Sequence, residues 1–213
     1  MFVKFCGFTR PEDIEAAASL GISAAGFIFY KKSPRCVSRE KARVLCRMLR
    51  GKGMMRVGVF VGASIFEIVE ICSTTDLDAL QLYDSLLAEE LRGMRPIIAA
   101  YRVGIEADLG RIKTPSGDDM ILLDSAGARG YGGTGERFDW SLLGKIPHAG
   151  RTIIAGGIQA QNLPELLSKI QPFGIDISSG IEDSPGIKSA EKMRDIMEMV
   201  RSIDKVKTLQ SKK

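Results

Sequence analysis

The sequence is organised around two stretches in its last third, Thr152-Ile-Ile-Ala-Gly156-Gly157 and Gly174-Ile-Asp-Ile-Ser-Ser-Gly180. Each begins as an isoleucine-rich run of strand length and ends in Gly or Ser, which leaves backbone N–H groups without partners where the strand stops. Such groups bind anions, and a short helix beginning at Ser179 or Gly180 would add more of them. Either stretch alone is typical of an ordinary turn. Two in succession predict a phosphate site of the kind that barrel enzymes build after strands 7 and 8.

Strand-like runs alternate with helix-like runs along the whole chain, and no segment resembles a linker. The predicted strands are Val3–Cys6, Ala24–Phe29, Met55–Val61, Leu77–Leu82, Pro96–Tyr101, Met120–Leu123, Arg151–Ala155 and Phe173–Ile177. This alternation predicts an α/β protein, a single-domain (β/α)8 TIM barrel over residues 1–213, with a doubly wound open sheet as the alternative. The residues from Lys205 to Lys213 are predicted to form a flexible, solvated tail.

The sequence also predicts where helices begin. The first helix is expected to open with Pro11 and to run to about Leu20, with Thr9 as its N-cap. Ser38 and Ser64 are expected to cap the helices that follow the second and third strands.

Composition limits the classes of protein that the chain can belong to. Hydrophobic residues make up 45% and charged residues 26%, which is typical of a globular protein with a sizeable core. The net charge is only +4 and basic residues mix with acidic ones, so no nucleic-acid partner is expected. The sequence has neither a signal peptide nor an apolar run of spanning length, so we expect a cytoplasmic protein with no membrane partner. The four cysteines lie far apart, which predicts neither a disulfide framework nor a metal site.

Three polar residues follow strand-like runs and are candidates for chemistry at the carboxyl end of a barrel. Cys6 ends the first strand, Asp124 ends the sixth, and Arg35 lies in the loop after the second. Each also has a purely structural interpretation. A strand cysteine is commonly a small core residue, the aspartate could cap a turn, and the arginine could be exposed beside its proline.

Side-chain alternation places further charged residues with these candidates. Lys4 and Cys6 share one face of the first strand, and Asp176 and Ser178 share one face of the last. A charged side chain under the outer helices would lack compensation, so this face is expected to be the barrel interior. Lys4 could alternatively be only a structural partner of Asp176. His148, the only histidine, is assigned no role.

Six motifs follow one another from the first predicted strand to the last. They are Lys4-Phe-Cys-Gly-Phe-Thr9, Ser33-Pro-Arg35, Leu123-Asp-Ser125, Gly132-Gly-Thr-Gly135 with Phe138-Asp-Trp140, Ala155-Gly-Gly157, and Asp176-Ile-Ser-Ser-Gly180 with Pro185-Gly186. Each motif alone occurs in many proteins, but in this order the chain resembles phosphoribosylanthranilate isomerase. The resemblance implies a cofactor-independent (β/α)8 barrel of tryptophan biosynthesis. Its reaction converts N-(5-phosphoribosyl)anthranilate to 1-(2-carboxyphenylamino)-1-deoxyribulose 5-phosphate by an Amadori rearrangement.

The resemblance implies two catalytic residues. Asp124 would protonate the furanose oxygen as the ring opens, and Cys6 would then remove the proton from C2. An acid in this role must hold a proton at working pH, so burial at the barrel mouth is expected to raise the pKa of Asp124. A thiol is a poor base until it ionises, and Lys4 on the same strand face is expected to lower the pKa of Cys6.

The resemblance also implies how the substrate is held. Arg35 would pair with the anthranilate carboxylate, and Asp176 would reach a ribose hydroxyl or anchor Lys4. The implied phosphate-binding residues are Gly156, Gly157, Ser178, Ser179 and Gly180. The loop from Ala126 to Gly135 is predicted to close over the substrate and exclude water. The family contains monomers and homodimers, and either state is compatible with the sequence.

One position departs from the family pattern. The chain has Gln81-Leu-Tyr83-Asp84 where the family usually has Gln-Leu-His-Gly. A tyrosine can donate a hydrogen bond but does not titrate near neutrality. Two alternatives therefore stay open: the related phosphoribosyl aminoimidazole isomerase of histidine biosynthesis, and a phosphosugar-binding barrel without activity. The first relies on an aspartate where this chain has Cys6, and Tyr83 is the only hint of the second.

Overall fold

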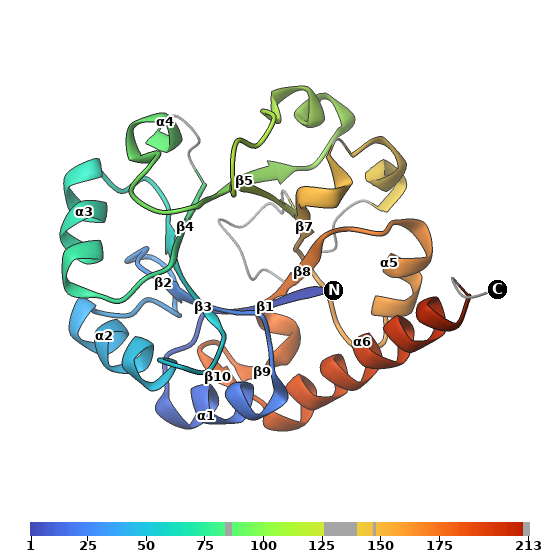
Figure 1. Cartoon of the computed structure of the whole chain (residues 1–213), viewed down its shortest axis with the longest axis horizontal. Coiled ribbons are helices and arrows are strands. Elements are labelled where there is room, and N and C mark those ends of the chain that lie inside the picture. The colour runs from blue at the N-terminus through green and yellow to red at the C-terminus, as the bar shows by residue number, and fades with distance from the viewer. Residues whose placement is uncertain (84–86, 126–139, 147, 211–213) are drawn as a thin grey trace.

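Eight parallel strands close into a barrel in the computed structural model, which describes residues 1–83, 87–125, 140–146 and 148–210. The strands are β1 (Phe2–Cys6), β2 (Ala24–Ile28), β3 (Met55–Phe60), β4 (Ala79–Leu82), β5 (Ile97–Val103), β6 (Met120–Ser125), β7 (Thr152–Ile154) and β8 (Gly174–Ile177). Each strand pairs in parallel with the next, and β8 pairs with β1 to complete the ring (Figure 1). The predicted barrel is therefore confirmed. All eight predicted strands are present, with ends that differ by a few residues.

Helices surround the barrel on its outside (Figure 1). The α-helices are α1 (Pro11–Leu20), α2 (Arg39–Met48), α3 (Ile65–Thr74), α4 (Ala88–Leu91), α5 (Leu163–Lys169) and α6 (Ala190–Gln210). In the described part of the chain, the connections after β5 and β6 contain short 3-10 helices instead: η2 (Glu106–Arg111), η3 (Trp140–Lys145) and η4 (Ala149–Arg151).

Two of the predicted helix caps are confirmed and one is wrong. The hydroxyl oxygens of Ser38 and Ser64 accept N–H bonds three residues on, which supplies the partners that the first turn of α2 and α3 lacks. Thr9 does not cap α1. The helix begins at Pro11 without a side-chain cap, and the Thr9 hydroxyl instead donates to the carbonyl oxygen of Gly186 at 2.5 Å.

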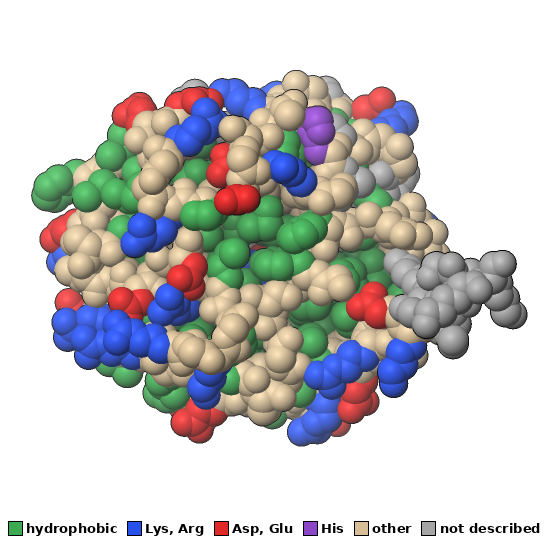
Figure 2. Space-filling view, viewed as in Figure 1, with side chains coloured by type: hydrophobic (Ala, Val, Ile, Leu, Met, Phe, Trp, Pro, Cys, Tyr) green, Lys and Arg blue, Asp and Glu red, His purple; other side chains and the backbone are tan. Residues whose placement is uncertain are grey.

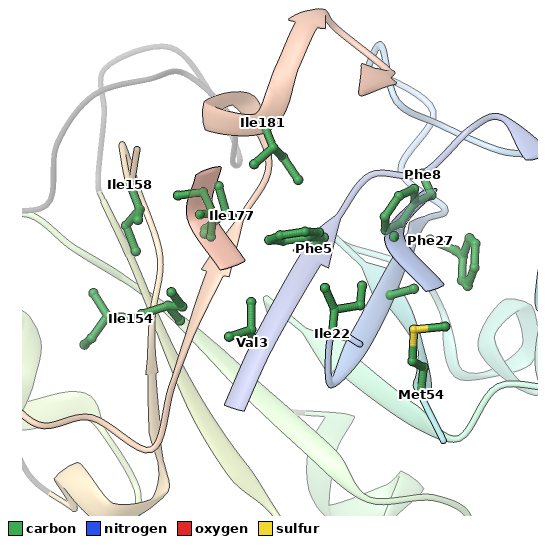
Figure 3. Packing of buried hydrophobic residues seen from close by; sticks show 14 of the residues in the cluster. Val3, Phe5, Phe8, Ile22, Phe27, Met54, Ile154, Ile158, Ile177 and Ile181 are labelled. Atoms are coloured by element: carbon green, nitrogen blue, oxygen red, sulfur yellow. The ribbon is translucent and has the colours of Figure 1, made fainter. Parts of the chain in front are cut away.

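The strands separate two apolar layers. Small and aliphatic side chains fill the barrel interior: Ala24, Val57, Ala79, Ile98, Ala100, Met120, Leu122, Ile153 and Ala155. Val3 and Phe5 of β1 belong to the larger layer between the strands and the helices, near Ile177 and Ile181 (Figure 3). Because side chains alternate along a strand, the residues between and after them, Lys4 and Cys6, point into the barrel. The predicted inward face is confirmed.

The chain does not pass directly from β8 to the last helix. A 3-10 turn, η5 (Ser179–Ile181), leads into an antiparallel pair of short strands, β9 (Glu182–Ser184) and β10 (Ile187–Lys188). α6 then continues through Gln210, so the first six residues of the predicted tail, 205–210, are helical. Residues 211–213 lie outside the described part of the chain.

Charged side chains of both signs are mixed around the rim of the face shown in Figure 2, and hydrophobic side chains gather near its centre. This distribution agrees with the small net charge of the sequence. Among the described helices, none is both long enough and apolar enough to cross a membrane.

Candidate active site

A cavity lies at the carboxyl ends of the strands and brings most of the predicted site residues together. The predicted residues that line it are Cys6, Arg35, Asp124, Gly156, Gly157, Asp176, Ser178, Ser179 and Gly180. Lys4 is the one predicted residue that does not line the cavity, because it lies one layer deeper in the barrel and is fully buried. The predicted closing loop, 126–135, lies outside the described residues.

Lys4 and Asp176 form a buried ion pair beneath the cavity. The two residues are in register on neighbouring strands, and Lys4 Nζ lies 2.9 Å from Asp176 Oδ2. Burial is the largest single effect and opposes the charge on the ammonium group, but the combined charges and hydrogen bonds of Asp176 and Cys6 raise the pKa of Lys4 above its ordinary value. Lys4 therefore remains a cation within the barrel, as the expected anchoring by Asp176 requires.

The Cys6 thiol lies close to this lysine. A Cβ atom placed on Gly26 would lie 2.7 Å from Cys6 Sγ and 3.2 Å from Lys4 Nζ, so the glycine leaves the space that both groups occupy. Burial raises the pKa of Cys6, while the charge and hydrogen bond of Lys4 act to lower it. The predicted influence of the lysine is therefore correct in sign, although burial is the larger effect and the net shift of the Cys6 pKa is upward.

Replacing Lys4 with methionine is expected to reduce the thiolate fraction of Cys6 at every pH across its titration. The variant removes the cation that favours the thiolate and leaves the buried Asp176 carboxylate without its partner. Thiolate absorbance near 240 nm, corrected with the same variant carrying Cys6→Ala, measures the change. Lys169→Met removes an exposed lysine paired with Glu165 and serves as the control. An unchanged Cys6 titration in Lys4→Met would show that the lysine does not activate the thiol.

Asp124 enters the cavity from the end of β6, which β7 separates from the strand of Asp176, β8. It follows the inward-facing Leu122 by two residues, so its side chain also points into the barrel. Burial raises the pKa of the Asp124 carboxyl, the hydrogen bond from Tyr83 lowers it, and the nearby Asp176 raises it further. The net shift is upward, which confirms the prediction and favours the protonated acid.

The loops after β7 and β8 form one wall of the cavity, and their backbones pack closely against each other. Gly156 and Gly157 have φ angles of +90° and +64°, in a region that other residues rarely adopt. A Cβ atom on Gly180 would lie 1.9 Å from the carbonyl oxygen of Ile158, so the two loops meet in a way that only glycine allows. The predicted short helix after strand 8 is the three-residue η5.

Arg35 is buried, so the alternative that it is an exposed residue beside Pro34 is wrong. Its Nε lies 2.9 and 3.1 Å from the two carboxylate oxygens of Glu182, and its Nη2 lies 2.6 Å from Glu182 Oε2. Burial disfavours the Glu182 charge, but the bonds from Arg35 and from Lys188 lower its pKa below the ordinary value. Nη1 takes part in none of these bonds, which leaves that edge of the guanidinium for a ligand in the cavity.

The sequence interpretation missed Glu182 and Lys188, which link three parts of the site. Lys188 Nζ donates to Glu182 Oε1 at 2.7 Å and to the carbonyl oxygens of Cys6 and Ser178 at 2.5 and 3.3 Å. The Ser178 hydroxyl also donates to the Cys6 carbonyl, at 3.1 Å. No local pattern marks either residue, because their burial results from the way β9 and β10 fold back over the strand ends.

Two buried acceptors complete the polar lining. Gln81 Oε1 and Asp176 Oδ1 are both buried, and neither has a hydrogen-bond partner within the described residues. Buried acceptors are rarely left unpaired in proteins, so these oxygens fit a ligand that carries hydroxyl donors. Gln81 is a third residue that the sequence interpretation did not assign.

The described residues contain no group of three or more His, Cys, Asp or Glu side chains that could hold a metal ion. His148 is exposed, and its Nε2 lies 3.3 Å from Thr114 Oγ1, at residues that do not line the cavity. The geometry therefore offers a thiol, a buried carboxyl group with a raised pKa, a guanidinium edge and a glycine-rich wall around one space.

Known proteins resemble this chain over nearly its whole length. A family model described as N-(5′-phosphoribosyl)anthranilate (PRA) isomerase matches residues 3–199. The N-(5′-phosphoribosyl)anthranilate isomerase of Pseudomonas paraeruginosa is 41% identical over 206 residues, which cover 94% of this chain and 95% of that protein. The crystal structure of phosphoribosyl anthranilate isomerase from Thermus thermophilus has a TM-score of 0.82 and 32% identity, and covers 95% of this chain and 100% of that one. A phosphoribosyl anthranilate isomerase in complex with reduced 1-(o-carboxyphenylamino)-1-deoxyribulose 5-phosphate has a TM-score of 0.80 and 30% identity, with coverages of 95% and 99%.

Proposed function

Because this chain belongs to the N-(5′-phosphoribosyl)anthranilate isomerase family, we propose that Cys6 is the general base and Asp124 the general acid of its reaction. The enzyme is a phosphoribosylanthranilate isomerase of tryptophan biosynthesis, as the ordered motifs predicted. One observation carries the assignment of the two roles. The thiol and the carboxyl come from β1 and β6, which are separated in the barrel by β7 and β8, and both line the same cavity.

The proposed reaction proceeds by proton transfers. Asp124 gives its proton to the furanose oxygen as the C1–O bond breaks, and the anthranilate nitrogen forms a Schiff base with C1. The Cys6 thiolate then removes the proton from C2, and the resulting enolamine gains a proton at C1 as its C2 hydroxyl becomes the ketone. No electron leaves or enters the substrate, so the steps require no redox cofactor. The raised pKa of Asp124 supports its role because the first step needs the neutral acid.

Substrate binding is assigned to the remaining residues of the cavity. We infer that the Nη1 edge of Arg35 pairs with the anthranilate carboxylate, and that Gln81 and Asp176 accept hydrogen bonds from sugar hydroxyls. The substrate phosphate is assigned to the wall formed by Gly156, Gly157, Ser178, Ser179 and Gly180. Lys4 acts from beneath this wall by holding Asp176 in place.

A fluorescence assay tests the activity directly. The anthranilate substrate fluoresces much more strongly than its product, so adding the protein should cause a decay with first-order dependence on protein concentration. The assay is run in EDTA, because the proposed steps use side chains alone. A flat trace would favour a barrel that binds phosphosugars without converting them. The phosphoribosyl aminoimidazole substrate of histidine biosynthesis, offered in parallel, measures any second activity.

Replacing Arg35 with methionine is expected to raise KM by about 10- to 100-fold and to change kcat much less, because the lost bonds are to a carboxylate that does not react. Glu182 remains bonded to Lys188 in this variant, so the carboxylate is not left unpaired. Arg56→Met is the matched control, since Arg56 forms a similar forked pair with Asp78 away from the cavity. Steady-state kinetics should give a normal KM for the control. A normal KM for Arg35→Met would remove Arg35 from the binding site.

The partners and the cellular location are also proposals. We propose that the phosphorylated substrate is the partner of this site, that the protein acts as a monomer or a homodimer, and that it works in the cytoplasm. The mixed surface charges support the expectation that nucleic acid is not a partner. Light scattering on the purified protein would distinguish the two oligomeric states.

A further inference from the structure

Tyr83 lies beside the proposed acid and has no part in the roles assigned so far. It follows the last residue of β4, packs against the inner apolar layer and lines the cavity. Its hydroxyl donates a hydrogen bond to Asp124 Oδ2 at 2.8 Å. We propose that Tyr83 is the positioning residue for the acid, fixing the carboxyl so that Oδ1 carries the proton that is given to the substrate. This inference rests on the proposed role of Asp124.

The hydrogen bond determines which oxygen holds the acid proton. A neutral carboxyl has one O–H and one carbonyl oxygen, and an oxygen that accepts a bond from a phenol is the one without the proton. Burial and the charge of Asp124 raise the pKa of the Tyr83 phenol well above its ordinary value, so the phenol keeps its proton and donates it in the bond to Oδ2. The proton is thus assigned to Oδ1.

The same bond also favours the reaction as it proceeds. A hydrogen bond to a carboxylate is about twice as strong as one to a neutral acid. When Oδ1 loses its proton to the furanose oxygen, the bond from Tyr83 strengthens, and so it lowers the energy of the transition state more than that of the bound substrate. The loss of this interaction should reduce kcat and leave KM nearly unchanged.

Several groups besides Tyr83 set the protonation of Asp124. Desolvation has the largest effect and favours the neutral acid, and Asp176 on β8 acts in the same direction. Arg102 on β5 and the backbone N–H of Ser125 favour the carboxylate. Cys6 on β1 interacts electrostatically with the Tyr83 phenol. Since the Tyr83 bond lowers the pKa of Asp124, removing it must raise that pKa.

The test compares Tyr83→Phe with Tyr101→Phe in the full-length enzyme. Tyr101 is on β5, packs with the outer layer, and its hydroxyl accepts a hydrogen bond from the backbone N–H of Lys113. Tyr101→Phe therefore also removes one phenol hydroxyl, but from a residue that does not line the cavity. We expect Tyr83→Phe to lower kcat by about 10- to 100-fold, the range for a hydrogen bond to a charged group. Its KM should stay within a few-fold of the wild-type value. The ¹³C NMR titration of the Asp124 carboxyl, assigned by its absence in Asp124→Asn, should move to higher pH.

Each possible result decides the proposal. A wild-type kcat in Tyr83→Phe would overturn it, and so would a lower kcat with an unchanged Asp124 titration, because a purely structural role does not require the carboxyl to titrate differently. Thermal melting checks that both phenylalanine variants remain folded. If Asp124→Asn keeps its activity, the acid itself is misassigned and this inference fails with it. If Asp124→Asn loses its activity while Tyr83→Phe keeps it, only the inference about Tyr83 fails.

Discussion

Replacing Cys6 with alanine is expected to lower kcat by about 10²–10⁴-fold, the usual effect of removing a positioned general base. The C2 proton would have no acceptor, because the amine nearest the thiol, Lys4, is held as a cation by Asp176. Substrate and product binding should persist, since the guanidinium and the glycine-rich wall come from other elements. Single-turnover fluorescence kinetics would separate the slow chemical step from binding.

A matched cysteine shows whether this effect is specific. Cys46 on α2 is as buried as Cys6 but belongs to the apolar layer outside the barrel. Cys46→Ala removes the same thiol group at a position that does not line the cavity, and its kcat should stay near the wild-type value. A loss of only a few-fold in Cys6→Ala would mean that another group removes the C2 proton.

Replacing Asp124 with asparagine is expected to lower kcat by a similar factor of about 10²–10⁴. The amide preserves the shape of the side chain and can accept the bond from Tyr83, but it has no acidic proton for the furanose oxygen. Ring opening would then become the slow step. Isothermal titration with product should show that binding is retained, because the substitution leaves the phosphate and carboxylate contacts in place.

The control for this variant lies at the opposite end of the same strand. Asp119 precedes β6, and its carboxylate accepts the N–H of Ile97 at 2.9 Å. Asp119→Asn changes the same functional group without touching the cavity, so its kcat should be normal while its stability falls slightly. Substantial turnover in Asp124→Asn would leave ring opening to another acid or to water.

The barrel could be predicted because the same sequence pattern, an apolar strand followed by a helix, is repeated along the chain. Each strand is an apolar run bounded by turn residues, and the alternation of side chains along β1 correctly placed Lys4 and Cys6 inside. The ends of the elements were less certain, as Thr9 illustrates. A threonine before Pro11 is a good N-cap by local rules, but here the hydroxyl bonds to Gly186, 177 residues away. Local propensity cannot register such a competing partner.

The candidate site was predictable only in part, for the same reason. Cys6, Asp124 and the glycine-rich turns stand at strand ends, which a parallel barrel gathers at one mouth. Glu182 and Lys188 come from a short hairpin whose burial no sequence period indicates. The effect of Lys4 on the pKa of Cys6 was predicted with the correct sign, but the sequence does not show how completely the thiol is removed from water, and that burial raises the pKa.

Lys188 connects two ends of the chain, because its ammonium group donates a hydrogen bond to the carbonyl oxygen of Cys6, 182 positions earlier. During synthesis on a ribosome, β1 emerges first and β10 among the last elements, so the thiol is made long before the residue that braces its backbone. A nascent chain halted before β10 would carry Cys6, Asp124 and Arg35 but not the brace that holds the first strand against the last. Full turnover should therefore appear only when translation is nearly complete.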